Sequence, residues 1–362
     1  MKIKFKLIQT FFAFLPAMYC YPQNTIQYVN ASNKLIQFEG RIDFIHNNVA
    51  AIYWPGSSIK LHFKGTEIKA TLKDQRGHNY YNVMIDEDSV YVLKLDSNKT
   101  TYTLASHLSS GEHTVELFRR TGWTSGVTRF YDFQISSQSK ILKLPHKKRM
   151  IEFYGNSITV GAAVESYVYA PGDTTDTNNS LSYAYLTAKH YNAKYSCIAS
   201  SGIGLMVSWG SLIMPDIYDR VNPGDSTSKW DFSKATPDIV VINLFQNDNA
   251  LVNMPEHSQF KRRFGNKAPD ENFIIQSYSR FVQNIRNKYP NAHIICVLGN
   301  MDAVRPGSPW PGFIEKAVAS LNDKKVYTNF FAYKNTPDHP NEMEQRQMAE
   351  NLIRFIDEHV KW

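Results

Sequence analysis

The spacing of apolar residues changes near residue 149, and this change indicates that the chain consists of two parts with different folds. From about residue 25 to 145, apolar and polar residues alternate in short runs such as Ile59–Phe63, separated by turns that contain glycine. Alternation with a period of two predicts an antiparallel β-sandwich, and we expect a jelly roll. Beyond residue 149, buried strands alternate with helical periods, which predicts an α/β layer around a parallel sheet. The segment Pro145–Lys148 is the expected joint.

The second part contains continuous apolar runs, which are typical of strands buried on both faces. We expect strands at 150–154, 194–199, 238–245 and 293–298, and helices at 182–190, 273–289 and 342–360. The last helix has a capping-box start, because Asn341 is followed three residues later by Glu344 and preceded by Pro340.

A serine turn follows the first of these strands. Gly155, Asn156 and Ser157 come directly after the apolar run, so a tight turn would hold the Ser157 hydroxyl at the carboxyl edge of the sheet. Open α/β sheets build their sites at this edge. A Gly-x-Ser turn alone is more often only a turn, so the prediction of a nucleophile depends on later segments.

Three later segments support a site at this edge. Gly202 follows a strand that ends in small residues, where backbone N–H groups can approach a ligand, although a plain strand-to-loop turn has the same pattern. Asn247 follows a second buried strand and is therefore expected at the same edge as Ser157. His339 lies in a loop before the last helix, where it is either a surface residue or a base.

Taken in this order, the serine turn, glycine turn, asparagine and late histidine resemble the SGNH (GDSL-type) hydrolases. The blocks 148–159, 182–188, 230–233 and 325–327 resemble carbohydrate esterase family 2, which contains two-domain enzymes of the acetylxylan esterase type. The resemblance covers residues 150–362 and, more loosely, the β-rich part before them. It implies a three-layer α/β/α (flavodoxin-like) hydrolase domain at 149–362, preceded by a smaller jelly-roll accessory domain at 25–145.

The resemblance also implies the chemistry. Ser157 would attack an ester carbonyl, while His339 accepts its proton and later returns it to the leaving alcohol. The oxyanion donors carried over from the family are the backbone N–H groups of Ser157 and Gly202 and the side-chain amide of Asn247. This chemistry needs no cofactor. No paired Cys/His spacing and no HExxH motif indicates a metal site.

The sequence departs from the family pattern around the histidine. The positions three and two residues before it, where related enzymes carry an aspartate, are Thr336 and Pro337. We therefore expect a Ser157–His339 dyad in which a backbone carbonyl orients the histidine. Asp338 is the alternative acid, if the loop bends its carboxylate inward.

Departures also occur near the other site residues. Asn156 stands where the family usually carries an aspartate, and Phe245-Gln246 replaces the common Gly-Thr before Asn247. The first change is expected to alter local hydrogen bonding. The second is expected to make the wall of the site bulkier.

Aromatic and basic residues are the candidates for substrate binding. Trp209 and Trp310 follow strands that end at the proposed edge, so each either stacks on a sugar ring or packs in the core. The stretch 251–272 holds Lys261-Arg262-Arg263, which either favours uronate-bearing glycans or forms a solvated face. In the β-rich part, Trp54 and Trp123 have the same two interpretations, and an accessory role for that domain is expected.

The first 20 residues have the pattern of a signal peptide, with lysines at the start followed by a short apolar stretch. We expect a secreted or periplasmic protein, without a membrane attachment after cleavage. A lipoprotein is less expected, because Ala17-Met18-Tyr19 before Cys20 is a poor lipidation signal.

Cleavage of the signal peptide would leave 37 basic against 33 acidic residues, too mild an excess of positive charge for nucleic-acid binding. Cys197 and Cys296 lie in apolar runs and are expected to be buried thiols.

We therefore predict a secreted serine esterase that removes O-acetyl groups from plant-type or marine polysaccharides or their oligosaccharides. One alternative is a lipase-like or thioesterase-like acyl hydrolase on non-carbohydrate esters, which would need a long apolar acyl tunnel. The other alternative is a carbohydrate-binding protein with a degenerate hydrolase domain. Comparison of acetyl with octanoyl esters, and the simple presence of esterase activity, would separate these hypotheses.

Overall fold

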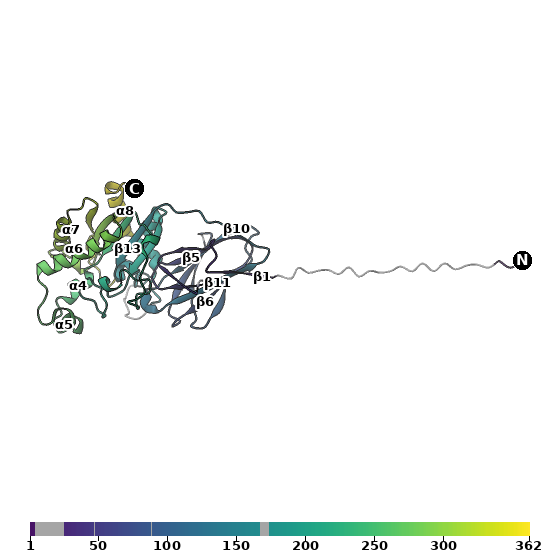
Figure 1. Cartoon of the computed structure of the whole chain (residues 1–362), viewed down its shortest axis with the longest axis horizontal. Helices are drawn as coiled ribbons and strands as arrows, with labels where there is room; N and C mark the ends of the chain where they lie inside the picture. Colours follow the sequence, from purple (N-terminus) through teal and green to yellow (C-terminus); the bar gives the residue numbers. More distant parts are fainter. Residues whose placement is uncertain (4–24, 47, 88, 167–173) are drawn as a thin grey trace.

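The computed structural model describes residues 1–3, 25–46, 48–87, 89–166 and 174–362. The chain forms an all-β region followed by an α/β region, and Figure 1 shows the two at opposite ends of an elongated molecule. Most of the predicted signal peptide, and Cys20 with it, lies outside the described residues. None of the described helices is long and apolar enough to cross a membrane.

The all-β region is a sandwich of two antiparallel sheets with six strands each. The first sheet has the order β3 (Ile42–Ile45), β4 (Val49–Ile52), β11 (Thr128–Ser136), β6 (Ile68–Asp74) and β9 (Thr100–Ala105), with β1 (Ile26–Asn30) paired to β11. The second has the order β12 (Lys140–Leu142), β5 (Ser58–Lys64), β10 (Glu112–Arg119), β7 (Tyr80–Ile85) and β8 (Ser89–Lys94), with β2 (Gln37–Glu39) paired to β5.

The path of the chain through these sheets is that of a jelly roll. From β4 to β11 the chain passes from one sheet to the other at every step except the β7–β8 hairpin. The period-two pattern explains the packing, because Ile59, Leu61 and Phe63 are fully buried between the sheets. The predicted jelly-roll sandwich is confirmed.

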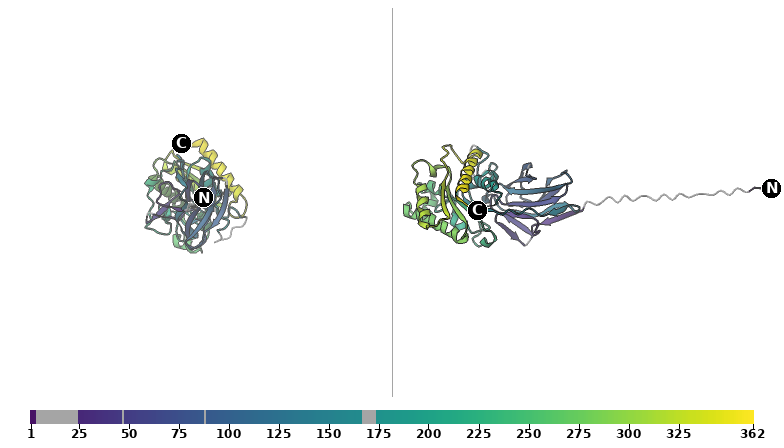
Figure 2. Two further views of the ribbon diagram at one scale, coloured as in Figure 1. Left: turned by 90° about the vertical axis from the view of Figure 1, so that its right-hand side faces the viewer. Right: turned by 90° about the horizontal axis from the view of Figure 1, so that it is seen from above.

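The α/β region is built on five parallel strands in the order β14-β13-β15-β16-β17. These strands are β13 (Met150–Gly155), β14 (Lys194–Ala199), β15 (Ile239–Asn243), β16 (His293–Leu298) and β17 (Val326–Phe330). On one face α2 (Tyr183–His190) packs against α8 (Glu342–His359), and on the other α6 (Glu271–Lys288) packs against α7 (Trp310–Leu321). In the view from above in Figure 2, the green helices α6 and α7 lie at the end away from the sandwich. The helix α2 lies next to the sandwich, where the ring of Tyr185 packs against Phe118 of β10.

Shorter helices connect these elements. They are α1 (Ser157–Val160), α3 (Met214–Ile217), α4 (Gln246–Leu251) and α5 (Ser258–Phe264), with 3₁₀ turns η1 (Trp123–Ser125), η2 (Asn179–Leu181), η3 (Phe232–Lys234) and η4 (Asp302–Val304). The central strands are buried on both faces: Phe153 of β13 packs toward α2 and α8, and its neighbour Tyr154 packs toward α6. The predicted α/β/α fold is therefore confirmed. Cys197 and Cys296 are buried free thiols, as predicted.

Several elements of the α/β region were not predicted, among them the helix α7 and the edge strand β17. The helix α7 begins with Trp310, Pro311 and Gly312, a sequence typical of a loop, although proline fits the first turn of a helix. The edge strand β17 is only partly buried, so it lacks the continuous apolar run that indicates the central strands. The stretch 251–272 also contains the unpredicted helix α5.

A buried ion pair joins the two regions. Arg41, which precedes β3, lies 3.2 Å from the carboxylate of Glu152 in β13, and both side chains are fully buried. The same carboxylate accepts hydrogen bonds from Tyr154, Ser196 and Tyr289 at 2.5 to 2.8 Å. These partners compensate the charge inside the protein and tie the sandwich to the strand that precedes Ser157.

Candidate active site

The order of the parallel strands determines where the site residues meet. The first strand, β13, lies between β14 and β15, so the connections on its two sides leave in opposite directions. A crevice forms at the carboxyl ends of strands at such a switch point. Ser157 follows β13, Gly202 follows β14 and Asn247 follows β15, so all three lie around this crevice.

Ser157 is the first residue of α1 and lies in a tight turn. The side-chain oxygen of Asn156 caps this helix by accepting a hydrogen bond from the backbone of Ile158 at 3.0 Å. A Cβ atom at Gly155 would lie 2.1 Å from the hydroxyl of Thr159, so only glycine allows the helix to turn back so closely. Ser157 is 7% exposed, which leaves its side chain only a narrow access to solvent.

His339 meets Ser157 from the loop before α8. Its Nε2 atom lies 2.7 Å from the Oγ atom of Ser157, although the two residues are 182 positions apart. The pKa of His339 is lowered to about 4, chiefly by burial; the charge of Asp338 opposes this shift, and the charge of Lys334 contributes to it. The imidazole is therefore neutral at pH 7, the form that can accept a proton from the serine.

The side chain of Asn247 is held from both ends. Its amide nitrogen donates a hydrogen bond to the carbonyl of Ile203 at 2.7 Å, and its oxygen accepts one from the indole N–H of Trp209 at 3.0 Å. Phe245, just before α4, has a φ of +86°, which is unusual for a side chain of this size. Its ring is buried against Tyr278 and Trp310, so this bulky residue fills the core.

Gly202 and Asp248 shape the turn that faces Asn247. Gly202 has a φ of +76°, and its carbonyl accepts a hydrogen bond from the backbone of Trp209 at 2.9 Å. Asp248 is fully buried and accepts hydrogen bonds from the backbone N–H groups of Leu205, Met206 and Val207 at 2.7 to 3.1 Å. Burial raises the pKa of Asp248 to about 6, although these hydrogen bonds oppose the rise.

The role of Asp248 was missed by sequence reasoning. The only signal in the sequence is an acidic residue directly after Asn247, shortly beyond an apolar strand. No group of three or more His, Cys, Asp or Glu side chains among the described residues is placed to hold a metal ion.

Comparisons with known proteins give the family. A model described as "Carbohydrate esterase 2 N-terminal" matches residues 38–145. The chain is 32% identical to the cellulase/esterase CelE of Acetivibrio thermocellus over 91% of its own length, but spans only 40% of that protein. It is 25% identical to an acetylxylan esterase/glucomannan deacetylase of Cellvibrio japonicus, over 92% of this chain and 91% of that protein.

A solved structure decides the assignment. A family two carbohydrate esterase from Clostridium thermocellum, in complex with cellohexaose, superposes with a TM-score of 0.78 at 30% identity. The match covers 89% of this chain and 98% of that one. The chain belongs to carbohydrate esterase family 2. The family resemblance predicted from the sequence blocks is thereby confirmed, together with the SGNH-like fold.

The two tryptophans proposed for substrate binding in this family 2 esterase have different positions. Trp209 is 47% exposed beside Asn247, with its ring edge against His257. Trp310 is only 4% exposed and packs against Phe245 and Phe313 in the core. The substrate-binding interpretation of Trp310 is therefore wrong, because a buried ring cannot stack on a sugar. The start of α7 at Trp310 was not predicted, because the sequence there is typical of a loop.

Two of the basic residues in the stretch 251–272 form ion pairs. Lys261 pairs with Glu256 at 2.6 Å, and Arg263 pairs with Asp216 at 3.2 Å. Arg263 also donates a hydrogen bond to the backbone carbonyl of Ser211, two residues after Trp209. These contacts favour a supporting role for the stretch beside Trp209.

Asp338, the alternative acid, is exposed and has a φ of +58°. Within the described residues its carboxylate makes no hydrogen bond or ion pair. Thr336 and Pro337, the positions where related enzymes carry an aspartate, contact Lys334 instead. The Ser157–His339 dyad and the role of Asp338 remain predictions.

The β-sandwich reaches the site through two contacts. The indole N–H of Trp123 donates a hydrogen bond to the hydroxyl of Ser200 at 2.8 Å. Trp123 also lines a hollow of about 250 Å³ together with Gly202 and Leu212. Trp54, by contrast, is fully buried in the core. The accessory region therefore forms part of the wall beside the glycine turn.

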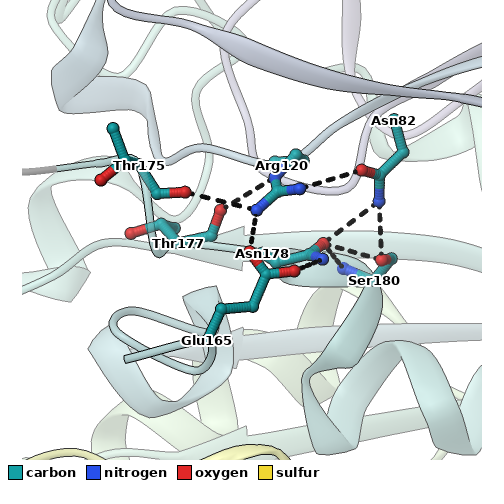
Figure 3. A network of polar contacts seen from close by, with 7 residues as sticks. All are labelled: Asn82, Arg120, Glu165, Thr175, Thr177, Asn178 and Ser180. Carbon is teal, nitrogen blue, oxygen red and sulfur yellow. Dashed lines mark hydrogen bonds and ion pairs between the residues drawn. The ribbon is translucent and has the colours of Figure 1, made fainter. Parts of the chain in front are cut away.

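The second contact is centred on Arg120, directly after β10 (Figure 3). Its guanidinium donates hydrogen bonds to Asn82 at 3.2 Å and to the backbone carbonyl of Thr177 at 3.3 Å, and it pairs with Glu165. Glu165 in turn accepts a hydrogen bond from Asn178 at 2.8 Å. This network fixes both described ends of the connection that follows the Ser157 helix.

Proposed function

We propose that this family 2 esterase removes O-acetyl groups from polysaccharides or oligosaccharides through Ser157 and His339. The observation that carries the proposal is the 2.7 Å contact between the Oγ atom of Ser157 and the Nε2 atom of His339 at the carboxyl edge of the sheet. The family supports the substrate class, because relatives are described as an acetylxylan esterase/glucomannan deacetylase and as a cellulase/esterase.

In the acylation step, the Oγ atom of Ser157 attacks the acetyl carbonyl carbon and its proton passes to Nε2 of His339. The carbonyl oxygen then carries the negative charge. When the tetrahedral intermediate collapses, His339 gives the proton to the sugar oxygen, which leaves as an alcohol. The acetyl group stays on Ser157 as an ester.

In the deacylation step, water attacks this ester while His339 accepts the water proton, and acetate leaves as the proton returns to Ser157. The oxyanion in both steps is stabilised by the backbone N–H groups of Ser157 and Gly202 and by the amide of Asn247. A side-chain amide has two N–H groups. One of those of Asn247 binds the carbonyl of Ile203, which leaves the other for the oxyanion.

The exposed ring of Trp209 offers a flat apolar surface next to Asn247, the proposed oxyanion donor. Such a surface is suited to stacking on a sugar ring. The structural relative was solved with cellohexaose, a glucan oligosaccharide. This combination supports a glycan substrate over a lipid ester.

Export and domain division belong to the same proposal. The basic and apolar pattern of residues 1–20 supports a signal peptide and a secreted or periplasmic location. The division into a sandwich at 25–145 and a hydrolase domain at 149–362 is supported by the ends of β12 at Leu142 and the start of β13 at Met150.

The test is acetate release from acetylated xylan, glucomannan and their oligosaccharides, compared with octanoyl esters. We expect acetate release that is lost in Ser157→Ala, with an unchanged thermal unfolding temperature. Preference for octanoyl esters would favour the lipase-like alternative. Binding to glycans without hydrolysis of any acetyl ester would favour a degenerate, carbohydrate-binding protein.

A further inference from the structure

The loop that carries His339 contains a buried lysine that makes no contact with the serine. Lys334 has a side chain that is only 4% exposed. Its ammonium nitrogen lies 2.9 Å from the carbonyl oxygen of Thr336, 2.6 Å from the hydroxyl of Thr336 and 2.8 Å from the carbonyl oxygen of Pro337. A lysine ammonium has three hydrogens, so these three acceptors use all of them.

The carboxylate of Glu344 in α8 completes the arrangement. One oxygen accepts a hydrogen bond from the hydroxyl of Thr336 at 2.5 Å, and the other accepts one from the backbone of Asn341 at 2.9 Å. The second oxygen also lies 3.8 Å from the ammonium of Lys334. One carboxylate therefore holds the chain on both sides of His339, three residues before it and two residues after it.

The backbone of the loop at 334–341, which carries His339, needs such support. Asn335 and Asp338 both adopt left-handed conformations, with φ of +50° and +58°. Non-glycine residues adopt this conformation at a cost, and they keep it where the surroundings hold it in place. Lys334 contacts the two residues that lie between these positions, Thr336 and Pro337.

We propose that Lys334 and Glu344 form a clamp that positions His339 for proton transfer from Ser157. In this chain a buried lysine, acting through the backbone of the loop, holds the catalytic base where it contacts the serine. Lys334 is thus a positioning residue, because its ammonium contacts Thr336 and Pro337 and acts on the serine through His339. The inference rests on the proposed function of the same site.

The charge of Lys334 gives the clamp a second, measurable effect. Among the residues that the structure describes, the charged groups that face His339 are Asp338 and Lys334 on its own loop, with Glu344 on α8 beyond Lys334. From α1, His339 meets the neutral hydroxyl of Ser157. The ammonium lowers the pKa of His339, and Asp338 raises it. Removal of the ammonium should therefore raise the pKa of His339 and move the acidic limb of kcat/KM to higher pH.

The experiment compares Lys334→Met with a control, Lys316→Met, which removes an exposed lysine paired with Glu271 on the far side of the sheet. For Lys334→Met we expect kcat on a small acetyl ester to fall between about 10- and 100-fold, because a slightly misplaced base is costly. KM should change less than about threefold, since no substrate contact is lost. The acidic limb should move up by about half a pH unit or more, and Lys316→Met should match the wild type.

An unchanged kcat, or a loss of kcat with an unshifted acidic limb, would overturn the clamp, because a purely structural lysine would not move the titration of His339. If Lys334→Met does not fold, Thr336→Val removes one acceptor and the link to Glu344, and should give a smaller loss of kcat. The titration of His339 by NMR separates this inference from the proposed function. A rise of its pKa in Lys334→Met, in a protein without esterase activity, would support the clamp's electrostatic part while rejecting the function.

Discussion

The two members of the proposed catalytic pair are held in different ways. Ser157 comes directly from the end of a buried strand, where Gly155 and the cap formed by Asn156 determine its position within three residues. His339 lies outside the sheet, on the loop at 334–341. This loop is held by the side chains of residues that come before and after His339 in the sequence. The position of the serine is thus a local property of a strand end. The position of the histidine depends on tertiary contacts of the loop.

The largest expected effects are at the pair itself. Ser157→Ala and His339→Ala should each lower kcat for acetyl ester hydrolysis by a factor on the order of 10⁴–10⁶, because they remove the nucleophile and the base of one unit. The double variant should be no worse than either single one. His190→Ala, at an exposed histidine of α2, is the control. Residual activity above about 1% of the wild type would remove either residue from the pair.

The next largest effect is expected at Asn247, whose side-chain amide is the proposed donor to the oxyanion. Asn247→Ala should lower kcat by ~10²–10³ with a smaller change in KM, because the amide acts mainly when charge develops on the carbonyl oxygen. Asn249→Ala, two residues further along α4, serves as the control. A change confined to KM in the first variant would mean that Asn247 binds substrate and does not stabilise the oxyanion.

A smaller effect is expected at Trp209. Trp209→Phe keeps an aromatic face but removes the N–H that orients the amide of Asn247. The loss of one hydrogen bond should lower kcat by up to about tenfold on a small acetyl ester. Trp209→Ala should in addition raise KM for an acetylated oligosaccharide, with Trp362→Phe as the control. If Trp209→Phe left kcat intact, the indole would have no role in orienting the amide.

The smallest effect is expected at Asp338. Its carboxylate is exposed, so Asp338→Asn should lower kcat by less than about threefold, against ~10⁴ where a true triad acid is neutralised. The pH profile should still change. Asp338 raises the pKa of His339, which lies at about 4, so its removal should lower that pKa further. The acidic limb should move to lower pH, opposite to the shift expected for Lys334→Met.

The same contrast explains what could be predicted from the sequence. The strands at 194–199 and 293–298 agree with β14 and β16, because buried parallel strands have a strong local pattern. Ser157, Gly202 and Asn247 follow such strands, and so their common edge could be predicted. The strand β17 was missed because it lies at the edge of the sheet and is only partly buried.

Contacts between distant residues could not be predicted in this way. The bond from Trp209 to Asn247 joins residues 38 positions apart, and the carboxylate of Asp248 holds a loop more than 40 positions before it. Lys334 and Glu344 become a clamp only after the loop has folded onto α8. Spacing in the sequence contains no signal for such pairs. The two interpretations of Trp310 could not be separated from the sequence for the same reason, since only packing shows that its ring is buried.

The most direct test of the Ser157–His339 pair is covalent labelling with a sulfonyl fluoride, followed by mass spectrometry of the peptides. A nucleophilic Ser157 displaces fluoride and forms one sulfonate ester per chain, while acetate release falls in parallel. We expect the adduct on the peptide that contains Ser157, with labelling nearly absent in His339→Ala and retained in Asp338→Asn. An adduct on another residue that abolishes activity, or full acetate release after Ser157 is labelled, would contradict the account.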